Sequence, residues 1–230
     1  MATLTLRQLV KKGFAFTPYE IVRKRKVDQN FDAVAHNTLF NVDKLFGDQK
    51  FLANYNNPTR TKFHFDTKEL VLDAVDPSMV QTIGDFGCGT GDFFSVLMPE
   101  FEHCELHGYD FANATLAAAR IRNPRAIYHQ HDLYEGADRR HDLVICSQTI
   151  EHLLEPQMAL KTLIDATAPG GLLVLTVPDG RSDTFKGHLQ FWSPESWASW
   201  IGRHVKAPHE IVVMANGTMG GSNLAAIIRP

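Results

Sequence analysis

The stretch Asp85 to Gly91 reads DFGCGTG, and its spacing indicates more about chemistry than any other part of the chain. Glycines stand at the alternate positions 87, 89 and 91. They allow the backbone to turn sharply, and they let a ligand approach it without Cβ atoms in the way. An apolar run that we expect to be a strand precedes this stretch, and a segment that we expect to be a helix follows it. A strand, a glycine-rich turn and a helix N-terminus in this order are typical of nucleotide-binding sites.

The spacing of these glycines excludes two common nucleotide-binding loops. The third glycine of the dinucleotide fingerprint G-x-G-x-x-G would stand at Asp92 or at Phe94, depending on where the count begins. No G-K-[ST] follows, as a phosphate-binding P-loop requires. Asp85, just before the glycines, would repel a pyrophosphate and would suit a cationic ligand. We therefore expect a positively charged nucleotide here, and the plain alternative is a turn that binds no ligand.

A second acidic residue follows the next expected strand. Asp110 comes directly after the run 105–109 and lies 19 residues beyond Gly91. A carboxylate at that spacing can accept hydrogen bonds from both hydroxyls of a ribose, and Phe111 beside it can pack on an adenine ring. The alternative role for Asp110 is to cap the helix that we expect from Asn113 onward. The two roles can coexist.

The pattern D-x-G-x-G-x-G of residues 85–91 resembles motif I of the class I S-adenosylmethionine (SAM) methyltransferases. The ligand of that family carries an ammonium and a sulfonium, which agrees with an acidic residue before the glycines. The resemblance covers about residues 80 to 200 and includes the EHL of residues 151–153 and the PGG of residues 169–171. It implies SAM as the cofactor, with Asp132 against the adenine amino group and Leu133 against the ring, where a surface turn is the alternative. The expected cofactor-binding residues are Asp85, Gly87, Cys88, Gly89, Gly91, Asp110, Phe111, Asp132, Leu133 and Ser147.

Two histidines stand where such an enzyme would activate a methyl acceptor. His152 follows the fourth expected strand and His188 follows the fifth. Methyl transfer from a sulfonium is an in-line displacement, and alignment supplies much of its rate. An amine or carboxylate acceptor needs positioning, whereas a hydroxyl needs a base, which is usually histidine. We expect His152, His188 and Glu151 to be catalytic. One role open to Glu151 is to orient His152 through a hydrogen bond, as carboxylates do for catalytic imidazoles. Alternatively, Glu151 and His152 merely cap and pack the next helix.

A metal site is a further alternative at the same place. Some O-methyltransferases, among them ubiquinone-pathway enzymes and small-RNA 2′-O-methyltransferases, are similar here, with ExxEH and a distant histidine. This chain offers Gln148, Glu151, His152 and His188 for such a set. Gln148 replaces the first carboxylate with a neutral and weaker ligand. We therefore expect no metal and keep a divalent cation as the alternative.

Apolar runs alternate with helical patterns from about residue 80, which predicts a parallel sheet with helices on both faces. We expect strands at 82–86, 105–109, 126–129, 143–146, 172–177, 210–214 and 224–228. We expect helices at 92–99, 113–121, 157–167 and 194–201. The PGG of residues 169–171 should break the chain between a helix and a strand, and the glycine-rich residues 215–222 should close a hairpin. The expected fold class is α/β, with a Rossmann-like seven-stranded mostly parallel sheet, a C-terminal antiparallel hairpin and a mostly helical N-terminal segment.

The first 65 residues differ from the rest in pattern, with scattered aromatics and a basic run at residues 23–26. We expect residues 1–65 to form a helical lid or substrate segment and residues 66–230 to form the SAM-binding domain. The basic run indicates either a solvated face or an anion contact, such as a phosphate-bearing substrate or a membrane surface. Residues 11–26 and 57–60 resemble the leaders of bacterial methyltransferases that act on surface glycans. A sugar hydroxyl is therefore the first acceptor that we expect, before natural-product or quinone hydroxyls.

The composition is that of an ordinary soluble globular protein, with 230 residues, 44% hydrophobic and 21% charged. The net charge of −3 gives no general case for nucleic acid or an anionic membrane as a partner. The three cysteines form no CxxC, which indicates buried reduced thiols in a cytoplasmic protein. The N-terminus does not read as a signal peptide. No apolar run approaches the ~20 residues that a membrane-spanning helix needs.

The expected function is SAM-dependent methylation of a hydroxyl on a small molecule or a sugar or glycan, with a histidine as general base. The alternatives are metal-assisted O-methylation of a quinone, a catechol or an RNA 2′-hydroxyl, and SAM binding without catalysis. Nucleic acid is the less favoured partner, because no sustained basic patch with interleaved aromatics occurs in the core. Asp92, where the fingerprint needs glycine, disfavours an NAD-dependent oxidoreductase. Nothing in the sequence indicates an oligomeric state.

Overall fold

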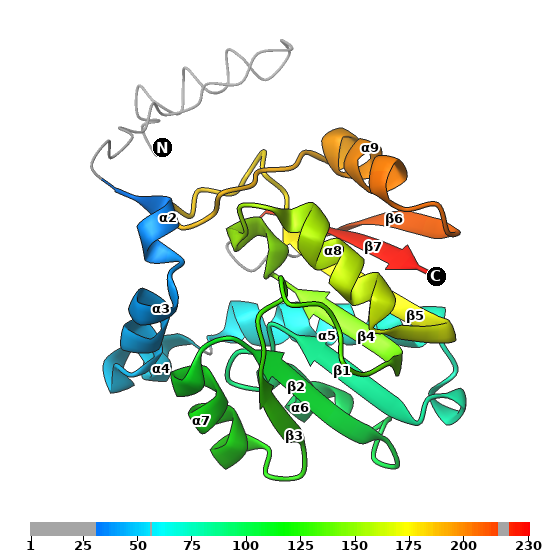
Figure 1. Ribbon diagram of the computed structural model, residues 1–230, viewed down its shortest axis with the longest axis horizontal. Helices are drawn as coiled ribbons and strands as arrows, with labels where there is room; N and C mark the ends of the chain where they lie inside the picture. Colours follow the sequence, from blue (N-terminus) through cyan, green and yellow to red (C-terminus); the bar gives the residue numbers. More distant parts are fainter. Residues whose placement is uncertain (1–30, 56, 216–220) are drawn as a thin grey trace, which may run out of the picture. The chain divides into compact units, whose positions relative to one another are not determined.

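Seven strands form one sheet in the computed structural model, which describes residues 31–55, 57–215 and 221–230 (Figure 1). Their order across the sheet is β3-β2-β1-β4-β5-β7-β6. Strands β1 to β5 run parallel, and β7 runs antiparallel to β5 and β6. The strands are β1 (Thr82–Phe86), β2 (Glu105–Asp110), β3 (Ile127–Gln130), β4 (His141–Ser147), β5 (Thr167–Pro178), β6 (His209–Met214) and β7 (Asn223–Ile228). The expected fold class is confirmed.

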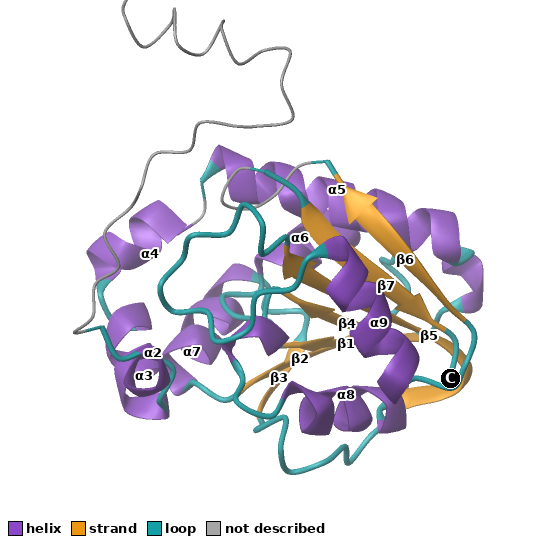
Figure 2. Ribbon diagram, turned by 90° about the horizontal axis from the view of Figure 1, so that it is seen from above, coloured by secondary structure: helices purple, strands orange, loops and turns teal. Residues whose placement is uncertain are grey.

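Helices cover both faces of this sheet (Figure 2). Helices α8 (Pro156–Asp165) and α9 (Pro194–His204) share a hydrophobic core with one face. Helices α5 (Pro58–Ala74), α6 (Asp92–Leu97) and α7 (Asn113–Arg122) cover the other face. A strand between two helical layers loses solvent on both sides, and every residue of β7 is accordingly buried.

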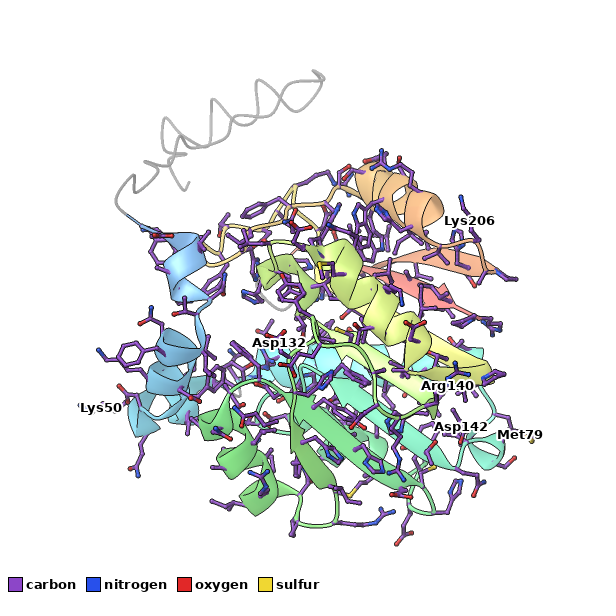
Figure 3. The ribbon with its side chains drawn as sticks, in the orientation of Figure 1. Lys50, Met79, Asp132, Arg140, Asp142 and Lys206 are labelled. Carbon is purple, nitrogen blue, oxygen red and sulfur yellow. The ribbon has the colours of Figure 1, made fainter. Side chains whose placement is uncertain are left out.

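The topology places the loops after β1 and β4 next to each other. Strand β1 pairs with β2 on one side and with β4 on the other, which makes it the switch point of the sheet. At the start of β4, the Asp142 carboxylate accepts hydrogen bonds from the backbone N–H and the hydroxyl of Thr82, at 2.9 and 3.1 Å. Asp142 and Asp132 lie at opposite ends of the strands (Figure 3). The end that carries Asp132 is therefore the end where ligands are expected.

Strand β5 departs from the sequence-based expectation. The pattern predicts a helix up to Thr167 and a break at residues 169–171. In the structure, helix α8 ends at Asp165, and Thr167 and residues 169–171 belong to β5. Thr167 pairs with His141 and Leu172 pairs with Leu143, so β5 uses more residues than β4 over the same interval. Such an excess is a bulge, and the φ of +80° at Gly170 accommodates it. The glycines therefore kink a strand instead of ending it.

The N-terminal segment is helical where the structure describes it. Its helices are α2 (Ala33–His36), α3 (Leu39–Phe46), α4 (Gln49–Tyr55) and the first half of α5. Helix α5 runs continuously across the expected boundary between residues 65 and 66, so the division into two domains stays a prediction. The basic run at residues 23–26 lies outside the described residues, as do residues 216–220 of the expected hairpin loop.

Two smaller expectations can be compared with the structure. All three cysteines are buried and carry free thiols, as the sequence predicts. Within the described residues, we find no helix with the length and apolar character that crossing a membrane requires.

Candidate active site

The glycine loop after β1 has a backbone that residues with side chains rarely adopt. Gly87, Gly89 and Gly91 have φ values of +78°, +52° and +72°. A Cβ at Gly87 would collide with the Thr149 side chain, and one at Gly91 would lie 2.8 Å from a tyrosine hydroxyl of β3. Among the described residues, a Cβ at Gly89 would meet the Tyr55 hydroxyl alone, at 3.7 Å. Gly87 and Gly91 thus allow close packing, whereas Gly89 faces the space from which a ligand would approach.

Asp110, the last residue of β2, holds this loop in place. Its Oδ2 accepts a hydrogen bond from Gly89 N and its Oδ1 accepts one from Ala112 N, at 2.9 Å each. Both oxygens keep a lone pair for a ribose hydroxyl. Burial raises the pKa of Asp110, although these hydrogen bonds oppose the rise. The alternative role as a cap of α7 falls instead to Asp43, whose carboxylate accepts from Ala114 N at 2.9 Å.

Charged groups of both signs line a small pocket beside the loop. Burial and the nearby Asp110 raise the pKa of Asp85 to about 7, and the Arg60 guanidinium opposes that rise. Burial and Arg60 together lower the pKa of His64 to about 3, so His64 is neutral. A carboxylate and a guanidinium in one pocket suit the ammonium and carboxylate of an amino acid. The pocket is lined by Arg60, His64, Asp85, Gly87, Cys88, Thr90, Asp92, Phe93 and Ser147.

The residues expected around adenine lie beyond the ends of β2 and β3. Leu133 is buried, Phe111 is half-buried, and the exposed Asp132 forms a turn by accepting a hydrogen bond from Tyr134 N at 2.9 Å. The Phe111 carbonyl accepts a hydrogen bond from the Gln130 side chain at 3.1 Å. Their placement is compatible with the expected role, and it is equally that of a surface turn, so the adenine contact stays a prediction.

A second group of functional side chains gathers beyond the end of β4. Glu151 and His152 belong to the short 3₁₀ helix η2 (Ile150–His152), and His188 comes from the loop after β5. Potential ligand atoms of these three residues all lie within 4.8 Å of one another. The rings of His152 and His188 meet edge to face, with centroids 4.6 Å apart. The expected catalytic residues are therefore brought together.

Glu151 is the most unusual member of this cluster. Its side chain is fully buried, and among the described residues neither carboxylate oxygen has a hydrogen-bond partner. Burial raises its pKa to about 7, and His188, whose Nε2 lies 3.8 Å from Glu151 Oε1, opposes that rise. Burying a carboxyl group without a partner is costly unless a ligand completes the site.

The two histidines have different partners. His152 Nδ1 lies 3.1 Å from Asn37 Oδ1, so the orienting contact that was one possible role of Glu151 is made by Asn37 instead. The tight turn of η2 points the consecutive side chains of Glu151 and His152 in different directions. His188 Nδ1 lies 2.5 Å from the buried Asp183 Oδ2. Burial and the neighbouring His188 lower the pKa of His152 to about 3, so His152 is neutral.

Gln148, the remaining member of the expected metal set, has an unusual backbone and a side-chain contact of its own. Its backbone has a φ of +52°, the one positive value among the described non-glycine residues. Its side-chain amide lies 3.5 Å from the Thr176 hydroxyl. A backbone held in this region indicates a local constraint at a functional loop.

Helices α4 and α5 join the glycine loop to the histidine cluster. The Arg60 guanidinium lies 4.1 Å from the centre of the Tyr55 ring. Arg60 lowers the pKa of both Asp85 and Glu151, so its charge acts on both groups. The glycine loop and the cluster are therefore parts of one site.

Sequence reasoning missed several of these residues. Asn37 and Asp183 were not predicted, Tyr55 was noted only among the scattered aromatics, and Arg60 only within a leader-like stretch. The signal of Asn37 and Arg60 is weak, because they lie far in sequence from the residues of the site on which they act. Asp183 is close in sequence to His188, but their contact depends on how the loop folds back. Tyr55 at the end of α4 and Arg60 in the first turn of α5 were the clearest pointers.

Comparisons with known proteins agree with this geometry. A family model described as a methyltransferase domain matches residues 67–209. The chain is 31% identical over 138 residues to a trans-aconitate 2-methyltransferase from Variovorax paradoxus (strain S110), which covers 59% of this chain and 53% of the relative. It is 25% identical over 147 residues to the enzyme of that name from Delftia acidovorans (strain DSM 14801 / SPH-1), covering 62% and 55%. The chain thus spans about half the length of these curated relatives.

Solved structures show the same fold at low sequence identity. The plantazolicin methyltransferase BpumL in complex with SAH superposes with a TM-score of 0.61 at 12% identity, covering 82% of this chain and 95% of that one. The methyltransferase domain of bacterial CtHen1-CN superposes with a TM-score of 0.59 at 18% identity, covering 72% and 98%. At these identities the likeness concerns the fold alone.

Proposed function

Because this chain belongs to the class I SAM-dependent methyltransferases, we propose that it transfers the methyl group of SAM to a hydroxyl of an uncharged small molecule or sugar, with His188 as the general base. The contact between His188 and Asp183 supports this proposal most directly. A carboxylate against Nδ1 keeps the proton on that nitrogen and leaves Nε2 as the basic atom, as in other enzymes with an activated imidazole.

The reaction moves one methyl group and one proton. The acceptor oxygen attacks the methyl carbon in line with the breaking carbon–sulfur bond, and SAM becomes S-adenosylhomocysteine (SAH). The acceptor proton passes to His188 Nε2. Asp183, 2.5 Å from Nδ1, stabilises the imidazolium that results. Glu151 Oε1 lies 3.8 Å from Nε2, close enough to help stabilise the imidazolium.

The cofactor would lie along the carboxyl ends of β1, β2 and β3. Asp110 would bind the ribose, while Asp132 and Leu133 would contact the adenine. The amino-acid part of SAM would lie in the pocket beside Asp85 and Arg60, because its ammonium and carboxylate match these charges.

The proposed role of Arg60 predicts a loss of affinity that depends on the ligand. Replacing Arg60 with methionine should weaken SAH binding roughly 10- to 100-fold, because a charge-assisted hydrogen bond of about 1.5–3 kcal/mol is lost. The affinity for 5′-methylthioadenosine, which lacks the amino-acid part, should change less than about threefold. Calorimetric titration with both ligands measures the difference.

A matched control for Arg60 exists on the same helix. Lys62 is exposed and pairs with Asp66, so Lys62→Met removes a cation of α5 outside the proposed pocket. Its affinity for both ligands should equal that of the unaltered protein. Equal weakening of SAH and 5′-methylthioadenosine by Arg60→Met would mean that Arg60 shapes the pocket without binding the carboxylate.

The charge of the cluster favours an uncharged acceptor over trans-aconitate, the substrate in the names of the relatives. Trans-aconitate is a tricarboxylate and requires cations near the transferred methyl group. The acceptor side instead presents the buried carboxylate of Asp183, and repulsion between like charges in a buried site costs several kcal/mol. Carboxylate methylation is nevertheless the second candidate function, because of those relatives.

A divalent cation would fit the same cluster. Glu151, His152 and His188 would hold it, and the unpartnered oxygens of Glu151 are the observation in its favour. A bound cation would act as a Lewis acid and lower the pKa of an acceptor hydroxyl. Asp183 would then orient His188 as a ligand, as carboxylates do for metal-bound histidines.

A transfer assay with methyl-labelled SAM separates these functions. The panel contains methyl glucoside, catechol and trans-aconitate, each with and without EDTA. We expect label in a hydroxyl compound, at a rate that EDTA leaves unchanged. Label in trans-aconitate alone would establish carboxylate methylation, and activity that EDTA removes and Mg²⁺ or Zn²⁺ restores would establish a metal. SAH binding with no transfer to any acceptor class would favour the non-catalytic alternative.

A further inference from the structure

We propose that Asn37 is a positioning residue that fixes the tautomer of His152. Asn37 follows α2, in the part of the chain that the family model does not match. It lies 115 residues from its partner. The inference rests on the proposed function, because it assigns His152 to the acceptor side of the site.

The hydrogen bonds of the Asn37 side chain determine which way its amide points. Its Nδ2 donates to the Ala33 carbonyl at 2.9 Å and to the Gly187 carbonyl at 2.7 Å. Both amide protons are thereby used, and Oδ1 must be the atom that faces His152. An amide oxygen can only accept, so His152 Nδ1 carries the proton and donates to it at 3.1 Å. The other ring nitrogen, Nε2, is then an unprotonated acceptor.

The choice of an amide has a chemical consequence for a pair of adjacent histidines. His188 Nδ1 faces the carboxylate of Asp183, and the centroid of its ring lies 4.6 Å from that of His152. His152 faces the uncharged amide of Asn37, whose oxygen accepts from Nδ1 and so fixes the tautomer. Asn37 therefore leaves Nε2 of His152 as a hydrogen-bond acceptor beside His188.

The same contacts join the N-terminal helices to the loop that carries His188. A Cβ at Gly187 would lie 2.5 Å from Phe185 and 2.7 Å from His36 of α2, so this loop and α2 touch where Gly187 has no side chain. On the other side, Asp43 of α3 accepts a hydrogen bond from the first turn of α7. Docking of α2 therefore places the Asn37 amide that fixes the tautomer of His152.

Nitrogen NMR of the histidine rings tests this proposal without knowledge of the acceptor. The full chain is labelled with ¹⁵N-histidine, and the His152 signals are identified by their loss in His152→Gln. In the unaltered protein, His152 should show a protonated Nδ1 and an unprotonated Nε2 near neutral pH. In Asn37→Ala that pattern should change to a mixture of tautomers. In Asn37→Asp the tautomer should return, because a carboxylate oxygen can also accept a hydrogen bond from Nδ1.

Two further measurements separate this role from a structural one. Asn41→Ala is the matched control, since Asn41 makes a comparable amide bond to the Ala35 carbonyl away from the cluster, and it should leave the His152 signals unchanged. SAH affinity should stay within about threefold in all variants, while kcat on the responsive acceptor falls in Asn37→Ala. An unchanged His152 tautomer in Asn37→Ala would overturn the proposal. Absence of transfer by the unaltered protein would instead count against the proposed function, since the NMR result does not depend on it.

Discussion

Replacing Gly89 with valine is expected to weaken SAH binding about 100-fold or more, or roughly 2.7 kcal/mol. Two effects add at this position. Gly89 has a φ of +52°, where a β-branched residue is strained. Its Cβ would enter the space in front of the loop, between Gly89 and the Tyr55 hydroxyl. The loop N–H that donates to Asp110 would shift as well. Calorimetric titration with SAH measures the loss.

Gly170→Val is the matched control for backbone strain. Gly170 has a φ of +80°, and within the described residues a Cβ there would meet no atom within 4 Å. Its variant should lose stability to a similar degree and bind SAH normally. Gly87 and Gly91 are poorer test positions, because a Cβ at either one would disturb packing even without a ligand. Ordinary SAH affinity in a folded Gly89→Val protein would contradict the assignment of the loop.

Replacing His188 with alanine should lower turnover about 10²- to 10⁴-fold, which is the range that a positioned general base contributes. SAH affinity should change less than about threefold, because His188 lies on the acceptor side of the site. The effect should therefore lie in kcat. Single-turnover transfer from labelled SAM to the responsive acceptor, combined with SAH calorimetry, measures the two quantities separately.

Two further variants test whether a loss of turnover in His188→Ala reflects the loss of a base. His204→Ala removes a histidine whose ring packs beside Trp200 in α9 and should leave turnover unchanged. His188→Gln keeps a polar side chain near Asp183 and should be as slow as His188→Ala, since glutamine is not a base. Full turnover in either His188 variant would exclude His188 as the base and would move that role to His152 or to a metal.

The sequence predicts those parts of the fold and site that neighbouring residues in the chain determine. The glycine spacing after β1 requires positive φ values, and all three glycines have them. Asp110 ends β2, next to the strand that the sequence predicts at 105–109. The bulge at Gly170 was missed, since a PGG stretch signals a break equally well whether the chain leaves a strand or kinks within it.

The contacts that the sequence does not predict are long-range. Asn37 and Arg60 reach the site from helices in the N-terminal segment, and no periodicity connects them with residues more than 20 positions away. The pairing of His188 with Asp183 is close in sequence but depends on how a loop folds back. The hydrogen bond from Glu151 to His152 that the sequence left open does not form, because His152 Nδ1 faces Asn37 and neither Glu151 oxygen has a hydrogen-bond partner among the described residues.

Calorimetric titration of the unaltered chain with SAH tests the central claim most directly. The account predicts one binding site with an affinity in the micromolar range or tighter and, in a parallel titration, no binding of NAD, because Asp92 stands where the dinucleotide fingerprint needs glycine. No heat of binding at about 1 mM SAH, which corresponds to less than about 4 kcal/mol of binding free energy, would contradict it.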